Sequence, residues 1–181
     1  MREIRWHGRA GQGAKTVSLL YALAMMRGGS WVQAFPEYGP ERSGAPMRAY
    51  TRVDSRRIRR RYGVTEPDAV VVLDPSLVAE ADVAAGLKPD GVLVLNSDRP
   101  LATGYTGRTV YVPAAELAVG GHVNVVMLGA LAAALGDPSL EELLAAAGAF
   151  FGAKKREALD SAATAIAAGY AAVRKEASCA A

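Results

Sequence analysis

Two short runs of the sequence carry residue types that could bind an anion. The first, residues 8–16, reads Gly-Arg-Ala-Gly-Gln-Gly-Ala-Lys-Thr and lies between a short apolar segment and a helical pattern. A glycine turn between a strand and a helix directs backbone N–H groups and a helix N-terminus at one point, where phosphate groups bind. The second run, residues 34–46, holds three prolines and two glycines around a Glu-Arg step. That composition predicts a rigid loop instead of a helix or central strand, and such loops often serve in binding.

The glycine run departs from both standard nucleotide-binding motifs. Its spacing is G-x-x-G-x-G, whereas the dinucleotide fingerprint needs G-x-G-x-x-G and an acid after the second strand, which here runs into Phe35-Pro36. A Walker loop needs Lys directly after its last glycine, but Ala14 intervenes, so Lys15 and Thr16 would project about 100° away. A generic anion cradle remains, and the alternative is a tight turn whose glycines only let helix and sheet pack closely.

Arginine is concentrated in one part of the chain. Eight of the 21 basic residues lie between residues 42 and 61, and Asp54 is the only acid in that window. They are Arg42, Arg48, Arg52, Arg56, Arg57, Arg59, Arg60 and Arg61. Such a cluster suggests an anionic ligand or an acidic partner surface. A solvated hairpin edge that charge protects from aggregation is an equal alternative.

The elements that would position these runs follow from the hydrophobic pattern. We expect strands over residues 4–7, 31–35 and 47–53, the last with a return strand over 57–61, and buried strands over 69–73, 91–95 and 109–112. Helical spacing covers residues 14–26, a helix opening at Asp74-Pro75, and three stripes that start near residues 123, 140 and 159. This order predicts a Rossmann-like α/β fold: a mostly parallel sheet covered by helices on both faces, with a β-hairpin insertion and C-terminal helices. Residues 1–181 would form a single domain.

Composition argues against several classes of function. No window approaches the roughly 20 apolar residues of a membrane span, and the N-terminus lacks a signal-peptide pattern, so we expect a cytoplasmic protein that binds no membrane. The single cysteine, Cys179, cannot hold an iron–sulfur cluster. With only His7 and His122 besides, a self-sufficient metal or Ser/His/Asp centre is not expected. No nucleic-acid reader motif accompanies the arginines, so we expect no nucleic-acid partner.

At these same residues the chain resembles the gamma subunit of 2-oxoacid:ferredoxin oxidoreductases. The resemblance rests on residues 8–13, on 34–36, and on 38–46 with the specific string Gly-Pro-Glu-Arg-x-Gly-Ala-Pro. It continues through Glu66-Pro67-Asp68, Leu73-Asp74-Pro75 and residues 124–130, and so spans most of the chain. One departure is Ala10, where the family usually has a further glycine; a methyl group there requires a negative φ.

The resemblance implies a complex that decarboxylates a 2-oxoacid on thiamine diphosphate with magnesium and transfers the acyl group to coenzyme A. Electrons would pass through iron–sulfur clusters to ferredoxin or to an NAD-reducing subunit. A pyruvate-type substrate is favoured, and an aryl 2-oxoacid is an alternative. The chain has one cysteine and lacks the Gly-Asp-Gly to Asn-Asn pattern of thiamine diphosphate sites. The cofactors would therefore lie in alpha, beta and delta-type (ferredoxin-like) partner subunits, leaving this chain as an accessory subunit without a catalytic residue.

The resemblance also implies that the chain helps to bind coenzyme A. The candidate cofactor-binding residues are Gly8, Arg9, Gly11, Gln12, Gly13, Lys15, Thr16, Glu41, Arg42, Ser43, Gly44 and Asn124. Backbone donors at residues 11–13 and the charge of Lys15 would meet the coenzyme's phosphates, and Asn124 would touch its pantetheine amides. Arg42 would contact a phosphate or lock its loop through Glu41.

Each of these assignments has an alternative. Asn124 could cap a helix that begins near residue 125, Lys15 and Thr16 could face water, and Glu41 with Arg42 could form an internal ion pair. His7 is expected to be a packed strand-end residue. For the whole chain, the alternative function is a stand-alone nucleotide-binding Rossmann-like domain.

Overall fold

The computed structural model describes residues 1–37, 44–152 and 156–179, and these contain a six-stranded sheet in the order β2-β3-β1-β4-β5-β6. The strands are β1 (Arg2–Arg9), β2 (Trp31–Glu37), β3 (Pro46–Asp54), β4 (Ala69–Val72), β5 (Val92–Asn96) and β6 (Arg108–Val112). Strands β1, β4, β5 and β6 pair in parallel, while β3 runs antiparallel to both β1 and β2. The predicted mostly parallel α/β sheet is confirmed.

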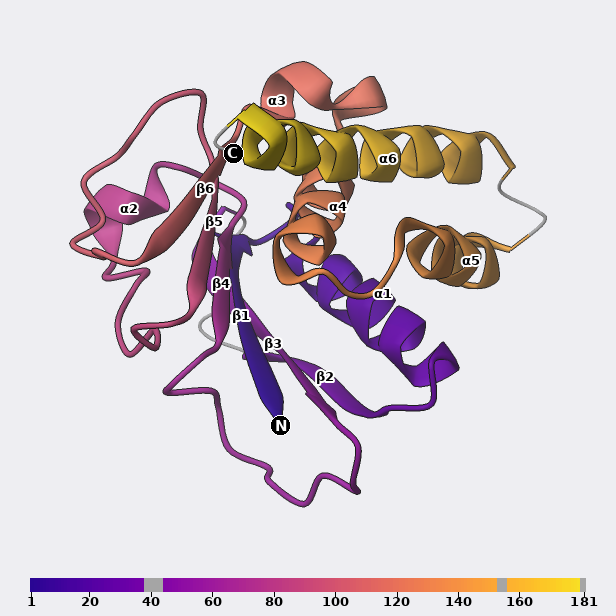
Figure 1. Ribbon diagram of the computed structural model, residues 1–181, viewed down its shortest axis with the longest axis horizontal. Coiled ribbons are helices and arrows are strands. Elements are labelled where there is room, and N and C mark those ends of the chain that lie inside the picture. The colour runs from indigo at the N-terminus through magenta and orange to yellow at the C-terminus, as the bar shows by residue number, and fades with distance from the viewer. Residues whose placement is uncertain (38–43, 153–155, 180–181) are drawn as a thin grey trace.

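The two faces of the sheet are covered unequally (Figure 1). The main helices gather on one face: α1 (Ala14–Arg27), α4 (Val123–Leu135), α5 (Leu140–Phe151) and α6 (Arg156–Cys179). The short helix α2 (Leu77–Glu80) lies on the other face, where Leu77, Val83 and Leu87 cover a smaller apolar cluster. Helix α3 (Ala114–Leu117) and the 3-10 turn η1 (Val119–Gly121) lead from β6 into α4.

Side-chain alternation along β1 shows how the sequence builds these two faces. Ile4 and Trp6 are fully buried in the main core beneath the helices, whereas the intervening Arg5 and His7 point to the opposite face. Strand β4 lies in the middle of the sheet beside β1 and is buried along its whole length, as its β-branched sequence predicts.

Two glycines let α6 pack closely against α4. A Cβ at Gly129 would overlap the carbonyl oxygen of Ile166, and one at Gly169 would overlap the carbonyl oxygen of Val126. Close contact between the two helix backbones therefore fixes α4, whose N-terminus reaches the carboxyl edge of the sheet.

The predicted return strand over residues 57–61 is wrong. Both edges of β3 are already paired, with β1 and with β2, so no edge remains for a further strand. The hairpin instead joins β2 to β3, and residues 55–68 form an irregular connection to β4.

Two further expectations about element boundaries need correction. Strand β2 does not stop at residue 35 but continues through Pro36 to Glu37, because an edge strand tolerates a residue without an N–H. The second strand therefore does end in an acid, Glu37. Because β3 separates β2 from β1, Glu37 does not lie beside β1 as the acid of a dinucleotide site does. Its carboxylate accepts a hydrogen bond from Tyr50. Helix α2 begins at Leu77 and not at Pro75, and Asp74 accepts a hydrogen bond from the Ser76 N–H.

Among the described residues, no helix combines the length and apolar character needed to cross a membrane.

Candidate functional site

A cavity of about 560 Å³ opens at the carboxyl edge of the parallel strands. It is lined by the glycine turn, by the segment after β4, by the end of β5 and by the start of α4: Gly11, Gln12, Gly13, Leu73, Asp74, Pro75, Asn96, Gly121, His122, Val123 and Asn124. The candidate residues Gly11, Gln12 and Gly13 thus line the same cavity as Asn124, which follows 111 residues after Gly13.

The cavity lies where the connections of the sheet diverge. From β1 the chain passes through α1 to β2 on one side, whereas from the adjacent β4 it passes through α2 to β5 on the other. Ligands of open α/β sheets bind at such a switch point, outside the carboxyl ends of the strands.

The glycine turn adopts a conformation that needs glycine at two positions. Gly11 has φ 96° and Gly13 has φ 80°, in the left-handed region. No described residue other than glycine has a positive φ, so Ala10 meets the condition for its methyl group. Gly13 caps α1 without a side-chain hydrogen bond, and the N–H groups of the first helical turn have no partner within the helix.

A second helix begins at the same cavity. Helix α4 is capped by His122, again without a side-chain hydrogen bond, and Val123 and Asn124 of its first turn line the cavity. The first turns of α1 and α4 hold no acidic residue. Two uncompensated positive helix ends therefore meet one cavity, which favours an anionic ligand.

Asn124 connects the two helix ends. Its Nδ2 donates to the Gly13 carbonyl oxygen at 3.5 Å, and a Cβ at Gly13 would overlap that nitrogen. The alternative that Asn124 caps a helix is wrong, because α4 begins at Val123.

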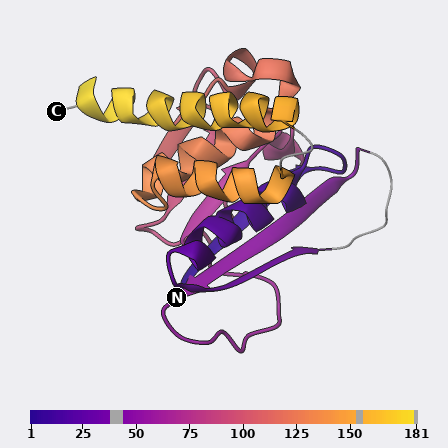
Figure 2. The same ribbon diagram turned by 90° about the vertical axis from the view of Figure 1, so that its right-hand side faces the viewer.

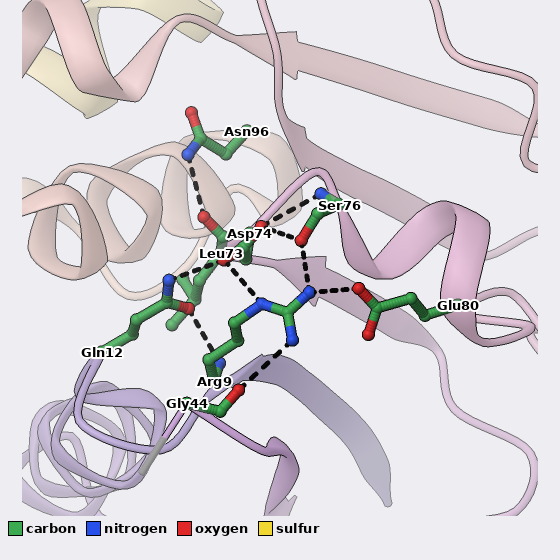
Figure 3. A network of polar contacts seen from close by, with 8 residues as sticks. All are labelled: Arg9, Gln12, Gly44, Leu73, Asp74, Ser76, Glu80 and Asn96. Atoms are coloured by element: carbon green, nitrogen blue, oxygen red, sulfur yellow. Dashed lines mark hydrogen bonds and ion pairs between the residues drawn. The ribbon is translucent and has the colours of Figure 1, made fainter.

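Arg9 ties the glycine turn to its surroundings (Figure 3). Its guanidinium contacts Asp74 Oδ2 at 3.2 Å and Ser76 Oγ at 2.6 Å, and it also pairs with Glu80. Nη1 donates to the Gly44 carbonyl oxygen at 3.2 Å. The Arg9 charge is thus directed at groups of the chain, and it holds the end of the proline-glycine loop beside the glycine turn.

Gln12 and Asp74 complete the wall beneath the turn. Gln12 Oε1 accepts from the Arg9 N–H at 2.8 Å, and its Nε2 donates to Asp74 Oδ2 at 2.7 Å. Burial acts to raise the pKa of Asp74, but hydrogen bonds from Ser76 and Gln12 and the charge of Arg9 outweigh it and lower the pKa. Asp74 is therefore a carboxylate neutralised by Arg9.

Asp74 and Asn96 line the cavity but are not among the predicted site residues. Asn96 donates to the Leu73 carbonyl oxygen at 2.8 Å and accepts from the Ala114 N–H at 3.1 Å, so it joins three segments of the wall. The signal that could have found both is their position at the end of a buried strand, where parallel sheets place ligand-facing groups.

The remaining candidates lie around the cavity or outside the described residues. Gly8 is inside β1, Lys15 is exposed in the first turn of α1, Thr16 is half-buried there, and Gly44 has φ 78°. Glu41, Arg42 and Ser43 lie outside the described residues.

The arginine-rich segment does not join the glycine turn. In the β1–β3 register, Arg9 pairs with Pro46 at the cavity, whereas Arg2 pairs with Val53 at the other end of the strands. Seven residues of strand separate these ends by about 23 Å. One phosphate group therefore cannot contact both the glycine turn and residues 56–61.

His7 is a packed strand-end residue, as expected, with 3% of its surface exposed. Arg5 Nε donates to His7 Nε2 at 3.0 Å. Burial, and then the charges of Arg5 and Arg48, lower the pKa of His7 to about 3.

The pKa of His7 predicts a pH-dependent stability. As pH falls below the ordinary pKa of 6.5, the unfolded chain takes up a proton that the folded chain binds only near pH 3. Stability should fall through this window, by about 2 kcal/mol between pH 7 and pH 5 from this group. We expect His7→Gln to lose that part of the pH dependence, measured by urea denaturation at both pH values. The same flattening in His122→Gln, which changes the other histidine, would contradict the assignment.

Comparison with known proteins gives consistent matches over most of the chain. Residues 3–172 match the sequence model described as pyruvate ferredoxin/flavodoxin oxidoreductase. The pyruvate synthase subunit PorC of Thermotoga maritima is 43% identical over 178 residues, covering 93% of this chain and 92% of that protein. The pyruvate/ketoisovalerate oxidoreductases common subunit gamma of Pyrococcus abyssi is 52% identical over 99 residues, covering 55% of this chain and 54% of that protein.

A solved structure shares the fold. The crystal structure of pyruvate oxidoreductase subunit PORC from Thermotoga maritima superposes with a TM-score of 0.81 at 39% identity, covering 93% of this chain and 94% of that one.

Proposed function

The chain belongs to the pyruvate ferredoxin/flavodoxin oxidoreductase family, and on this premise we propose that it is a gamma-type accessory subunit that binds part of coenzyme A. The complex would oxidatively decarboxylate a 2-oxoacid, pyruvate or a close relative, to an acyl-CoA. Membership of this family confirms the resemblance seen in the sequence. It favours a complex subunit over the alternative of a stand-alone nucleotide-binding domain.

The observation that carries the proposal is the meeting of two helix N-termini and a glycine turn at one cavity. Coenzyme A brings a pyrophosphate and a 3′-phosphate, and such groups are stabilised by free N–H donors and by positive helix ends. A volume of about 560 Å³ is within the range of small-molecule sites and would hold part of the coenzyme.

Individual residues take separate roles in this proposal. Gly11 and Gly13 let the backbone approach a phosphate, and Asn124 offers its amide to the ligand. Lys15 supplies a point charge near the start of α1. Glu41, Arg42 and Ser43 remain part of the proposal on the basis of the sequence string alone.

The redox cofactors do not fit the donor groups of this chain. An iron–sulfur cluster needs several thiolates, and the chain has one cysteine. The described residues hold no group of three His, Cys, Asp or Glu side chains that could bind a metal ion. We therefore propose that thiamine diphosphate, magnesium and the clusters belong to alpha, beta and delta-type partners, with ferredoxin or an NAD-reducing subunit as acceptor.

Replacing Asn124 by aspartate tests the site. A carboxylate in the first turn of α4 suits the helix dipole, which offsets the loss of the long hydrogen bond from Asn124 to Gly13, so the fold should lose little thermal stability. The same charge would repel a phosphate in the cavity. In the purified complex we expect the KM for coenzyme A to rise at least about tenfold, while the KM for the 2-oxoacid stays unchanged.

Asn124→Ala is the matched variant, because it removes the amide without adding charge. We expect a smaller rise in the KM for coenzyme A than with aspartate. An unchanged KM in Asn124→Asp would exclude coenzyme A phosphates from this cavity. Calorimetric binding of NAD or ATP by the full chain, without binding of coenzyme A, would favour the stand-alone nucleotide-binding alternative.

A further inference from the structure

A second functional surface lies at the end of the sheet opposite the cavity. Residues 55–63, here called the arginine loop, connect β3 toward β4 and project beyond the sheet (Figures 1 and 2). The loop contains five exposed arginines and no acidic residue: Arg56, Arg57, Arg59, Arg60 and Arg61. It also exposes the large aromatic side chain of Tyr62.

The backbone of the arginine loop is held from beneath. Arg52, fully buried on β3, donates through Nη2 to the Tyr62 carbonyl oxygen at 2.6 Å and to the Gly63 carbonyl oxygen at 3.2 Å. The Arg52 guanidinium also lies 5.3 Å from the centroid of the Tyr62 ring. Arg60 pairs with Glu3 at 3.5 Å, and Gln33 donates to the Ile58 carbonyl oxygen at 3.4 Å. Contacts from β1, β2 and β3 thus fix the loop in one shape.

Three of the arginines on this anchored backbone have no partner in the described part of the chain. The side chains of Arg57, Arg59 and Arg61 make no ion pair or hydrogen bond with any described residue. A loop that served only solubility would need the charge but not the anchored backbone. Unpaired arginine side chains on an anchored backbone are available for bidentate contacts with carboxylates.

Exposed aromatic surface lies beside the arginines. The Trp31 side chain is 52% exposed. In the β2–β3 register Trp31 lies opposite Asp54, the residue before the loop, and it shares a face of β2 with Gln33. Tyr62 is 58% exposed. Arginine together with tryptophan and tyrosine is the composition of protein–protein contact centres. Strand β2 is moreover the edge of the sheet, with one side unpaired in the described chain.

We propose that the arginine loop, together with Trp31, docks onto an acidic face of another subunit of the same complex. The proposal rests on the role of the chain as a subunit but not on coenzyme A binding, since the two surfaces lie at opposite ends of β1. Aromatic area beside fixed arginines suits a lasting subunit contact more than a brief encounter with a small electron carrier, which buries less surface.

Charge reversal tests the docking surface. Arg57→Glu with Arg61→Glu changes two exposed side chains that make no hydrogen bond or ion pair with a described residue, so the chain should keep its melting temperature. Like charges would then face each other across the interface, and we expect the dissociation constant of this subunit from its complex to rise at least about tenfold. The wild-type dissociation constant should increase with salt, and the variant should lose most of that dependence. Sedimentation of the reconstituted complex at several salt concentrations measures both.

Arg99→Glu with Arg108→Glu is the matched control, because it reverses two exposed arginines on the β5–β6 side of the sheet, away from β2, and changes the net charge equally. We expect this control to assemble like the wild type, and Arg57→Lys with Arg61→Lys to keep part of the affinity. Equal assembly of the loop variant and the wild type would overturn the proposal. It would equally be overturned if the loop variant assembled normally but lost binding to RNA, or showed a higher KM for an acidic electron carrier.

Discussion

Replacing Arg52 by alanine is expected to destabilise the chain by about 3–5 kcal/mol, because it breaks a buried ion pair on one side only. Arg52 is 0% exposed and its Nε contacts Glu3 Oε1 at 2.6 Å. The substitution leaves that carboxylate buried, and the carbonyl oxygens of Tyr62 and Gly63 lose their donor. Chemical denaturation of the full chain measures the loss.

Detachment of the arginine loop should accompany the lost stability. With its anchor removed, the loop should be cut by trypsin well before the wild-type loop is, under conditions where both proteins remain folded. Arg48→Ala is the control: Arg48 lies on the same strand, is half exposed, and pairs with Glu37 at 3.9 Å. A half-exposed pair contributes no more than about 1 kcal/mol. Similar losses in the two variants would show that Arg52 is not the anchor.

The contrast between Arg48 and Arg52 also marks the limit of sequence-based prediction here. The alternation along β3 correctly places Arg48, Tyr50 and Arg52 on one face. Which arginine is buried depends on Glu3, Tyr62 and Gly63, which come from two other segments. No local pattern predicts that contact. The hairpin pattern likewise predicted a return strand over residues 57–61, but β3 has no free edge with which such a strand could pair.

The candidate site also combines residues that the local sequence predicts with residues that only the fold brings together. Gly11 and Gly13 can be predicted from the local sequence, because a turn with positive φ requires glycine at those positions. Asn124 is predicted as a site residue from its place in a family motif. Its contact with Gly13, 111 residues earlier, depends on the fold. Asp74 comes shortly after the buried strand β4 and Asn96 is the last residue of β5, and only the strand order β1-β4-β5 brings them to the cavity.

Replacing Gly13 by alanine should have the largest effect on coenzyme binding. At φ 80° an alanine costs about 1–2 kcal/mol of stability. Its Cβ would overlap Asn124 Nδ2 and lie 3.2 Å from Asn124 Cγ, so the amide must leave the cavity wall and the two helix ends lose their connection. The displaced Asn124 side chain would also occupy space that the ligand needs, so we expect the KM for coenzyme A in the complex to rise about 100-fold, more than in Asn124→Ala.

Gly11→Ala separates backbone strain from the displacement of Asn124. Gly11 has φ 96°, but a Cβ there would meet no atom within 4 Å, so the stability loss should be similar and the rise in KM much smaller. In an Asn124→Ala background the overlap disappears, and Gly13→Ala should then lose no more stability than Gly11→Ala does. If Gly11→Ala raised the KM as much as Gly13→Ala, strain in the turn alone would explain both results. The contact between Gly13 and Asn124 would then have no part in holding the coenzyme.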